Sequence, residues 1–178
     1  FAPTAVAVKY LEAEGVVDGV IRTGDVMLDL AISIRDLTAD RSAEVLGRFG
    51  VEAEKYALVT MHRAENTDDE ERWAGIVNGL AALGGGGLHV VWLVHPRVAD
   101  KVGRLDLPGV LLHKPQPYLE TQILLDSARV VITDSGGLQK EAAFHSRPCI
   151  TVRTETEWVE LLDAGVNRLV KAEPEAIR

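Results

Sequence analysis

Residues 131–141 read Val-Ile-Thr-Asp-Ser-Gly-Gly-Leu-Gln-Lys-Glu, a β-branched run that passes through Ser-Gly-Gly into an amphipathic segment. The run predicts a buried strand, and the segment after it predicts a helix. The first backbone N–H groups of a helix have no intrahelical partner, and the helix dipole adds partial positive charge there. This order therefore predicts an anion site, and the alternative is an ordinary tight turn capped by Asp134 or Ser135.

The residue types around this turn suit a particular anion. Glycine at 136 and 137 lets the backbone approach a phosphate without a Cβ in the way, and Ser135 adds a hydroxyl donor. Glu141 lies about one helical turn into the segment, on the face that looks back toward the ligand. Its carboxylate can accept two hydrogen bonds from a ribose diol. The pattern predicts a nucleotide with a diphosphate and a sugar.

Short β-branched runs alternate with amphipathic segments along almost the whole chain. This alternation predicts an α/β fold, a Rossmann-like parallel sheet with helices on both faces. We expect strands at Val20–Arg22, Ala57–Met61, His89–Val94, Val110–His113, Val130–Thr133 and Cys149–Val152. We expect covering helices at Ala5–Glu14 (capped by Thr4), Val26–Arg35, Arg41–Phe49, Asp69–Leu83, Tyr118–Asp126 and Leu138–His145. The four glycines Gly84–Gly87 follow a helix instead of opening one, so we expect a flexible surface connection without function.

Two further loops follow predicted strands, at the sheet edge where open parallel sheets bind ligands. His62, Arg63, Glu65 and Asn66 come directly after the strand at Ala57–Met61. They form either part of a ligand site or a solvated loop in which Asn66 or Thr67 caps the next helix. The segment at 153–158, Arg-Thr-Glu-Thr-Glu-Trp, follows the strand at Cys149–Val152, and a ligand role and a plain polar connection are both open for it.

Composition excludes several classes of protein. The chain has 178 residues, 19 Lys and Arg against 27 Asp and Glu, and a formal charge of −8, so we expect no nucleic-acid partner. The longest apolar run, Val90–Val94, is far shorter than the roughly 18 residues of a membrane span. Cys149 is the only cysteine, which excludes an internal disulfide and a multi-cysteine zinc site and fits a reducing cytoplasm.

The three loops together carry a family resemblance. Three segments resemble the non-hydrolysing UDP-N-acetylglucosamine 2-epimerases in residue identity, order and spacing. They are His-Arg-Ala-Glu-Asn at 62–66, Thr-Asp-Ser-Gly-Gly-Leu-Gln-Lys-Glu-Ala at 133–142 and Arg-Thr-Glu-Thr-Glu-Trp-Val-Glu at 153–160. Phe-Ala-Pro-Thr at 1–4 and Arg-Thr-Gly-Asp-Val-Met-Leu-Asp at 22–29 extend the resemblance over essentially the whole chain. It implies one half of a two-domain glycosyltransferase-B-like fold. The chain starts at Phe1, and we expect 1–18 to be the tail end of a first domain and 19–178 a nucleotide-binding second domain truncated at its C-terminus.

The resemblance also implies roles for residues. His62 would contact the diphosphate and be needed for turnover. Ser135, Gly136 and Gly137 would hold the β-phosphate, Glu141 the ribose, and Arg153 would lie near the nucleotide. Gln116 and Tyr118 fall in the family's uracil-contacting loop, and Arg63 and His95 fall where some bacterial members bind a second, allosteric substrate molecule. The implied set is catalytic His62 with substrate-binding Arg63, Glu65, Gln116, Tyr118, Ser135, Gly136, Gly137, Glu141 and Arg153.

The implied reaction is inversion at C2 of UDP-N-acetylglucosamine to UDP-N-acetylmannosamine, by elimination and re-addition of UDP, without metal or other cofactor. The family's proton-transfer carboxylates belong to the first domain, so we expect this piece alone to bind UDP and to be inactive. Expected partners are the UDP-sugar, the first domain of the same polypeptide and, in the parent, a second copy in a homodimer. A glycosyltransferase of the same fold and a non-catalytic UDP-sugar-binding module are the alternatives.

Three positions depart from the family pattern. Trp158 and Val159 stand where many bacterial members have Arg and Pro, and Lys140 stands where an acidic residue is usual. The first two departures open the possibility of a modified sugar such as a diacetamido uronate. Lys140 is expected to point away from the ligand.

Overall fold

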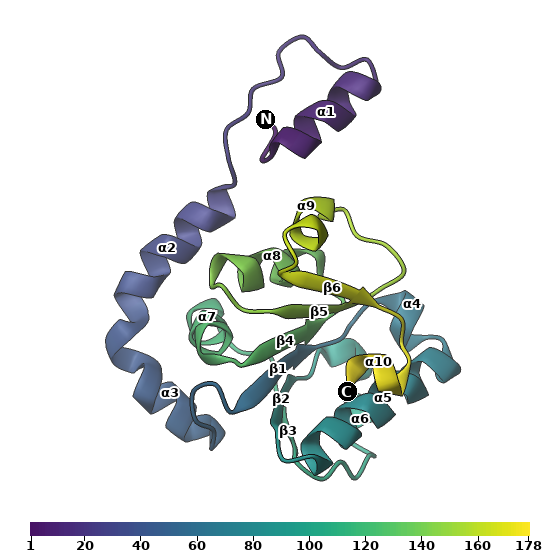
Figure 1. Cartoon of the computed structure of the whole chain (residues 1–178). Coiled ribbons are helices and arrows are strands. Elements are labelled where there is room, and N and C mark those ends of the chain that lie inside the picture. Colours follow the sequence, from purple (N-terminus) through teal and green to yellow (C-terminus); the bar gives the residue numbers. More distant parts are fainter.

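A six-stranded parallel sheet forms the centre of the protein (Figure 1). The computed structural model describes the backbone of residues 1–178 and all side chains except those of residues 36 and 39. The strands lie in the order β3-β2-β1-β4-β5-β6. They are β1 (Tyr56–Thr60), β2 (His89–Leu93), β3 (Val110–His113), β4 (Val130–Thr133), β5 (Cys149–Val152) and β6 (Asn167–Val170). The predicted fold class, a Rossmann-like parallel sheet covered on both faces, is confirmed.

Helices cover both faces of the sheet. One face carries α3 (Ser42–Phe49), α7 (Tyr118–Ser127) and α8 (Gly136–Phe144), with α2 (Val26–Thr38) outside them; the other carries α5 (Glu70–Gly85), α6 (Ala99–Val102) and α10 (Pro174–Ile177). Short pieces complete the chain: η1 (Ala39–Arg41), α4 (Ala64–Thr67), η2 (Pro96–Val98) and α9 (Val159–Asp163). In the part of the chain that the structure describes, no helix is both long and apolar enough to cross a membrane.

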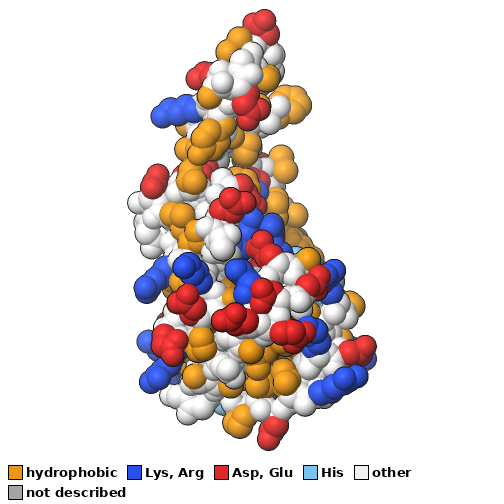
Figure 2. Space-filling view, turned by 90° about the vertical axis from the view of Figure 1, so that its right-hand side faces the viewer, with side chains coloured by type: hydrophobic (Ala, Val, Ile, Leu, Met, Phe, Trp, Pro, Cys, Tyr) orange, Lys and Arg blue, Asp and Glu red, His pale blue; other side chains and the backbone are white. Residues whose placement is uncertain are grey.

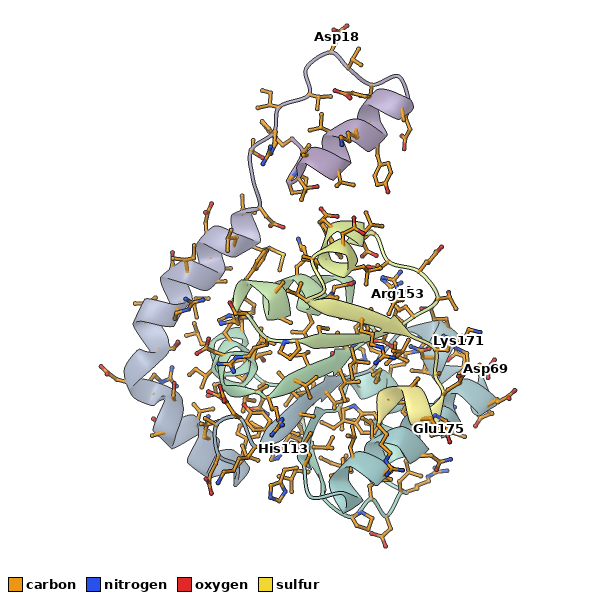
Figure 3. All side chains as sticks on the ribbon, viewed as in Figure 1. Asp18, Asp69, His113, Arg153, Lys171 and Glu175 are labelled. Atoms are coloured by element: carbon orange, nitrogen blue, oxygen red, sulfur yellow. The ribbon has the colours of Figure 1, made fainter. Side chains whose placement is uncertain are left out.

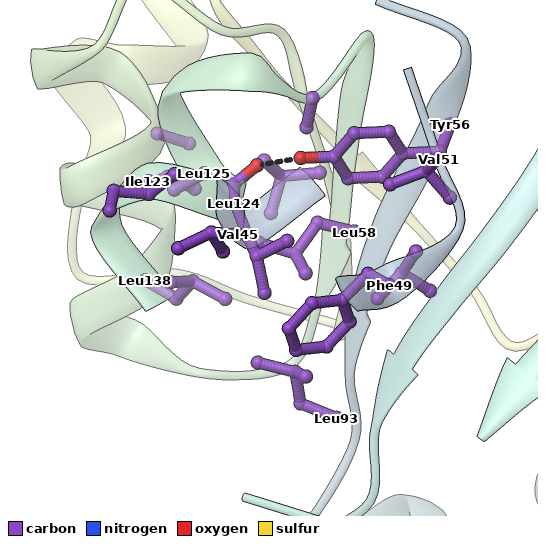
Figure 4. Packing of buried hydrophobic residues seen from close by; sticks show 14 of the residues in the cluster. Val45, Phe49, Val51, Tyr56, Leu58, Leu93, Ile123, Leu124, Leu125 and Leu138 are labelled. Atoms are coloured by element: carbon purple, nitrogen blue, oxygen red, sulfur yellow. Dashed lines mark hydrogen bonds between the residues drawn. The ribbon is translucent and has the colours of Figure 1, made fainter. Parts of the chain in front are cut away.

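The period-two alternation of β1 divides the hydrophobic core into two layers. Tyr56 and Leu58 pack among α3, α7 and α8, and the Tyr56 hydroxyl donates a hydrogen bond to the Leu124 carbonyl (Figure 4). Ala57 and Val59 pack on the opposite face against α5, α6 and α10. Because successive side chains of a strand point to opposite faces and both faces are covered, every one of these positions must be apolar.

The N-terminal segment lies apart from the sheet (Figures 1 and 2). Its helix α1 (Ala5–Ala13) is capped by Thr4, whose side chain accepts a hydrogen bond from the Ala7 amide, so the predicted cap is confirmed. The predicted strand at Val20–Arg22 is wrong, because Arg22 makes only an isolated bridge with Ala2. The expectation that this helix covers the sheet is also wrong, since α1 buries none of its residues.

The remaining differences from the predicted elements are small. The strand β6 and the helices α9 and α10 were not expected. The sequence does not indicate β6, since residues 167–170 read Asn-Arg-Leu-Val and half of them are polar. The helix expected from Leu138 begins two residues earlier, at Gly136, and the helix expected to end at Leu83 continues to Gly85. Asp69 caps that helix by accepting from the Glu71 and Arg72 amides, so the alternative with Asn66 or Thr67 as its cap is wrong.

The Gly84–Gly87 run is only partly the flexible connection that the sequence predicts. Gly84 lies in α5 with its backbone against Gly109, and a methyl group added at Gly84 would lie 2.5 Å from the Pro108 carbonyl oxygen. Gly87 adopts a positive φ of 93°, which favours glycine. The run therefore combines a close backbone approach with a turn.

Gly75 gives a test of how α5 supports the sheet. A methyl group added there would overlap the backbone carbonyl of Ala172, ahead of α10, whereas one added at Gly85 of the same helix meets nothing within 4 Å. We expect Gly75→Ala to lower the free energy of unfolding by about 1–2 kcal/mol, because overpacking outweighs the gain in helix propensity. Gly85→Ala is the matched control and should be neutral or slightly stabilising. Denaturant unfolding measures both, and equal effects would contradict the close packing.

Candidate functional site

The candidate site lies where β1 and β4 end side by side. Thr60 and Thr133 are register partners there, and their hydroxyl oxygens are 2.7 Å apart. From this point the chain leaves β1 toward α5 on one face and leaves β4 toward α8 on the other. Such a divergence at the carboxyl ends of neighbouring parallel strands opens a crevice, the usual ligand position in doubly wound sheets. Two of the loops singled out by the sequence thus meet at the switch point.

Asp134 joins these two loops. Its carboxylate is fully buried and accepts hydrogen bonds from the backbone N–H groups of His62 (3.1 Å) and Arg63 (2.9 Å). It also accepts one from Asn66 Nδ2 at 3.1 Å. The same Asn66 amide donates to the Val152 carbonyl at 2.9 Å, which extends the network to the end of β5. Asn66 is therefore a fully bonded structural residue, and one carboxylate fixes three strand ends relative to each other.

The start of α8 has the geometry of an anion site. Ser135 is its N-cap, with its hydroxyl accepting from the Leu138 amide at 3.4 Å, which is the cap that the alternative interpretation of this turn named. The next amides, those of Gly136 and Gly137, have no hydrogen-bond acceptor among the groups that the structure describes. A methyl group added at Gly137 would have only the Ser135 hydroxyl near it, at 3.9 Å, so this glycine leaves the approach open. These amides can bind an anion.

A hollow of about 300 Å³ lies in front of this helix start. Its lining includes donors suited to phosphate, and it includes the carboxylate of Glu141 as an acceptor. Its lining comprises Thr60, His62, Leu93, His95, Pro115, Gln116, Thr121, Ser135, Gly137, Leu138 and Glu141. Of the residues that the sequence singled out, the hollow thus brings together His62, Gln116, Ser135, Gly137 and Glu141.

His62 is held at the rim of the hollow from two sides. Its Nδ1 lies 3.4 Å from Asp134 Oδ1, and its ring stacks on that of His95 with centroids 5.3 Å apart. His95 Nδ1 accepts a hydrogen bond from the Arg97 amide, so a neutral His95 carries its proton on Nε2. A His62 that points Nδ1–H at Asp134 has Nε2 free for a ligand. Sequence reasoning treated Asp134 only as a helix cap, and its position directly before Ser-Gly-Gly was the available signal.

Glu141 also lines the hollow and is nearly buried. The Tyr118 hydroxyl donates a hydrogen bond to Glu141 Oε1 at 2.8 Å. Burial raises the pKa of Tyr118, and so does the neighbouring Glu141 carboxylate, so Tyr118 remains a donor over the physiological range. Tyr118 contacts the site by its hydrogen bond to Glu141. Gln116, which lines the hollow, donates a hydrogen bond from Nε2 to the Lys114 carbonyl at 2.7 Å. This geometry leaves the second Glu141 oxygen available to hydroxyl groups of a ligand.

The other predicted residues form a second group beside the helix start. Arg153 lies beyond the end of β5 (Figure 3), where its Nη1 donates to Glu157 Oε2 at 2.7 Å. Its Nε lies 3.8 Å from Glu65 Oε1. A methyl group added at Gly136 would overlap the Glu157 carboxylate and would lie 3.8 Å from Arg63. Figure 2, turned toward the side on which α4 lies, shows acidic and basic side chains interleaved over this face.

The departures Lys140 and Trp158 contact each other. Lys140 Nζ lies 4.3 Å from the centroid of the Trp158 ring and 2.6 Å from Asp25 Oδ2, so it points away from the hollow, as predicted. Partial burial acts to raise the pKa of Asp25, but the hydrogen bond and charge of Lys140 outweigh it and lower that pKa. These contacts tie the connection ahead of α2 to α8. Among the side chains that the structure describes, no cluster of three or more His, Cys, Asp or Glu is arranged to hold a metal ion.

Fold and site together define a doubly wound α/β domain with a hollow at its switch point, in front of the α8 start. Residues 1–178 match the UDP-N-acetylglucosamine 2-epimerase family. The chain belongs to that family, which confirms the resemblance drawn from the three loops.

Individual relatives agree with this assignment. The chain is 41% identical over 97% of its length to the UDP-2,3-diacetamido-2,3-dideoxy-D-glucuronate 2-epimerase of Pseudomonas aeruginosa and covers 48% of that protein. It is 36% identical over 99% of its length to a UDP-N-acetylglucosamine 2-epimerase homolog of Methanococcus maripaludis, of which it covers 51%. A crystal structure of the Methanocaldococcus jannaschii UDP-GlcNAc 2-epimerase in complex with UDP-GlcNAc and UDP superposes with a TM-score of 0.87 at 31% identity, covering 99% of this chain and 51% of that one. The chain thus spans about half the length of these relatives, as expected for one half of a glycosyltransferase-B-like fold.

Substitution of Asp134 tests its central position. In Asp134→Asn, an amide replaces an acceptor that faces two backbone N–H groups, so buried donors lose their partners. We expect the free energy of unfolding to fall by about 2–4 kcal/mol, measured by urea denaturation. The control is Asp68→Asn, which breaks an exposed ion pair with Arg97 and should change stability by about 1 kcal/mol or less. An Asp134→Asn protein as stable as the control would refute the assignment.

Proposed function

We propose that this chain is the UDP-binding half of an enzyme that inverts C2 of UDP-N-acetylglucosamine. The observation that carries the proposal is the hollow at the switch point, which is lined by Ser135 and Gly137 of the α8 start, by His62 and by Glu141. Amides at a helix start suit a diphosphate, and a carboxylate suits a ribose diol. The match to the family over residues 1–178 supports the same assignment.

The proposed chemistry is an elimination followed by re-addition. A base removes the proton at C2, the electron pair forms the C1–C2 double bond, and the C1–O bond breaks to release UDP and a glycal. Protonation of C2 from the opposite face and re-addition of UDP give the epimer. Negative charge grows on the β-phosphate as C1–O breaks, so the helix-terminal amides, Ser135 and His62 stabilise the transition state. We assign the base to the half of the polypeptide that the relatives have beyond this chain's length.

The sugar defines a second candidate. Identity of 41% to the diacetamido-glucuronate epimerase favours a diacetamido uronate as substrate, in line with the departures at Trp158 and Val159. Both candidates use the same UDP half-site. The family match favours an epimerase over a glycosyltransferase of the same fold.

The whole enzyme is proposed to be a cytoplasmic homodimer in which residues 1–18 belong to the preceding domain. The resemblance supports the dimer and this boundary, and the single buried Cys149 is compatible with a reducing compartment. Light scattering on the whole protein measures its mass and tests the dimer.

UDP binding to this chain tests the half-site. In an NMR titration the amides of Ser135, Gly136 and Gly137 are expected to shift most, and the largest shifts elsewhere would refute the site. Glu141→Gln is expected to weaken UDP by about 1–3 kcal/mol, because a hydrogen bond to a charged group is lost, and to leave pyrophosphate unchanged, since pyrophosphate has no ribose. Equal losses for both ligands would remove Glu141 from the ribose.

Turnover tests the role of His62 in the whole protein. With UDP-N-acetylglucosamine or the UDP-diacetamido uronate in deuterated water, deuterium at C2 is followed by NMR. His62→Ala should slow exchange by about 10²-fold or more, the usual scale for a positioned proton donor or oxyanion partner. The control is His89→Ala, an exposed histidine at the opposite end of β2. Exchange by residues 1–178 alone at the rate of the whole protein would show that the base lies within this chain.

A further inference from the structure

An anion already lies at the start of α8, next to the residues that line the hollow. The Glu157 carboxylate lies against Gly136, where a methyl group would overlap it, and binds Arg153 Nη1 at 2.7 Å. The absence of a side chain at position 136 therefore makes room for Glu157, whereas at position 137 it leaves the hollow open. Two consecutive glycines serve two different anion positions around one helix start.

The two partners of this ion pair differ in exposure. The Arg153 side chain is only 8% exposed, and its Nε is buried without a hydrogen-bond partner in the described part of the chain. The Glu157 side chain is 47% exposed and can rotate into solvent. A guanidinium that is fixed, buried and incompletely bonded can accept a second anion in place of the first.

The charge of Glu157 opposes the binding of a second anion. Partial burial acts to raise the pKa of Glu157, but its own backbone N–H, the Arg153 hydrogen bond and the charges of Arg153 and Arg63 together lower it. Glu157 is thus an anion at neutral pH, and it repels a diphosphate that approaches the neighbouring amides while it neutralises Arg153.

We propose that Glu157 is an internal competitor for phosphate: it holds Arg153 in the ligand-free protein and leaves when a diphosphate binds at the start of α8, so that Arg153 exchanges a carboxylate for a phosphate group. The proposal rests on the proposed function, because it needs the anion to bind at this helix start. No covalent step is involved.

Glu157→Gln is the direct test, because the amide keeps a hydrogen-bond acceptor for Arg153 and removes only the charge. Pyrophosphate and UDP are titrated by calorimetry into the unmodified chain and the variant. We expect the variant to bind both ligands about three- to tenfold more tightly. Uridine, which has no phosphate, should bind both proteins equally. The matched control is Glu155→Gln, which makes the same charge change in the same loop. Glu155 is exposed and has no ion pair in the structure, so we expect the affinity for either ligand to change by less than about twofold.

The outcomes separate this inference from the proposed function. Unchanged or weaker binding of pyrophosphate by Glu157→Gln, with UDP still shifting the Ser135–Gly137 amides, would overturn the competition and leave the half-site standing. Shifts outside these amides would overturn the half-site itself. If neither protein binds pyrophosphate or UDP, the competition and the half-site are both wrong. An Arg153 Nε–Hε NMR signal that moves on Glu157→Gln and moves again with pyrophosphate would support the exchange, and a signal that pyrophosphate leaves unmoved would contradict it.

Discussion

The buried carboxylate of Asp134 is the interaction on which the site depends. A buried carboxylate is stable only when donors surround it, and here the donors are the backbone of His62 and Arg63 and the side chain of Asn66. Asp134 also directly precedes the N-cap of α8. The same side chain therefore fixes the loop after β1 and the first amides of α8, so the distance between His62 and those amides follows from one set of hydrogen bonds.

The two glycines after Ser135 show how a short turn can serve different purposes on its two sides. Gly137 leaves space in front of the helix amides, as a phosphate-binding turn requires. Gly136 instead accommodates Glu157, which reaches back from the loop after β5. In an acidic chain with a net charge of −8, a proposed anion position thus depends on helix amides and a few nearby cations, and an acidic side chain of the chain itself lies next to that position.

Contacts outside the hollow tie the N-terminal connection to the domain. Lys140 binds Asp25 and lies over Trp158. The helix α8 therefore carries the proposed ligand site on one side and these contacts of Lys140 on another. Both Lys140 and Trp158 depart from the sequence pattern that the chain otherwise resembles. The contact is favourable, since an aromatic ring attracts a cation.

The sequence by itself determined the sheet and the principal loops. Continuous β-branched runs such as Val130–Thr133 predicted buried strands, and the Ser-Gly-Gly turn predicted a helix start after them, because these features depend on neighbours along the chain. Anion binding at that helix start stays a prediction. Val20–Arg22 was wrongly expected to be a strand, and β6 was missed, because a three- or four-residue segment becomes a strand only when another strand lies beside it. The tertiary structure alone decided that Asp134 would accept hydrogen bonds from the loop after β1 and that Glu157 would pack against Gly136. Such contacts join residues far apart in sequence, and their geometry follows from how the sheet brings the strand ends together.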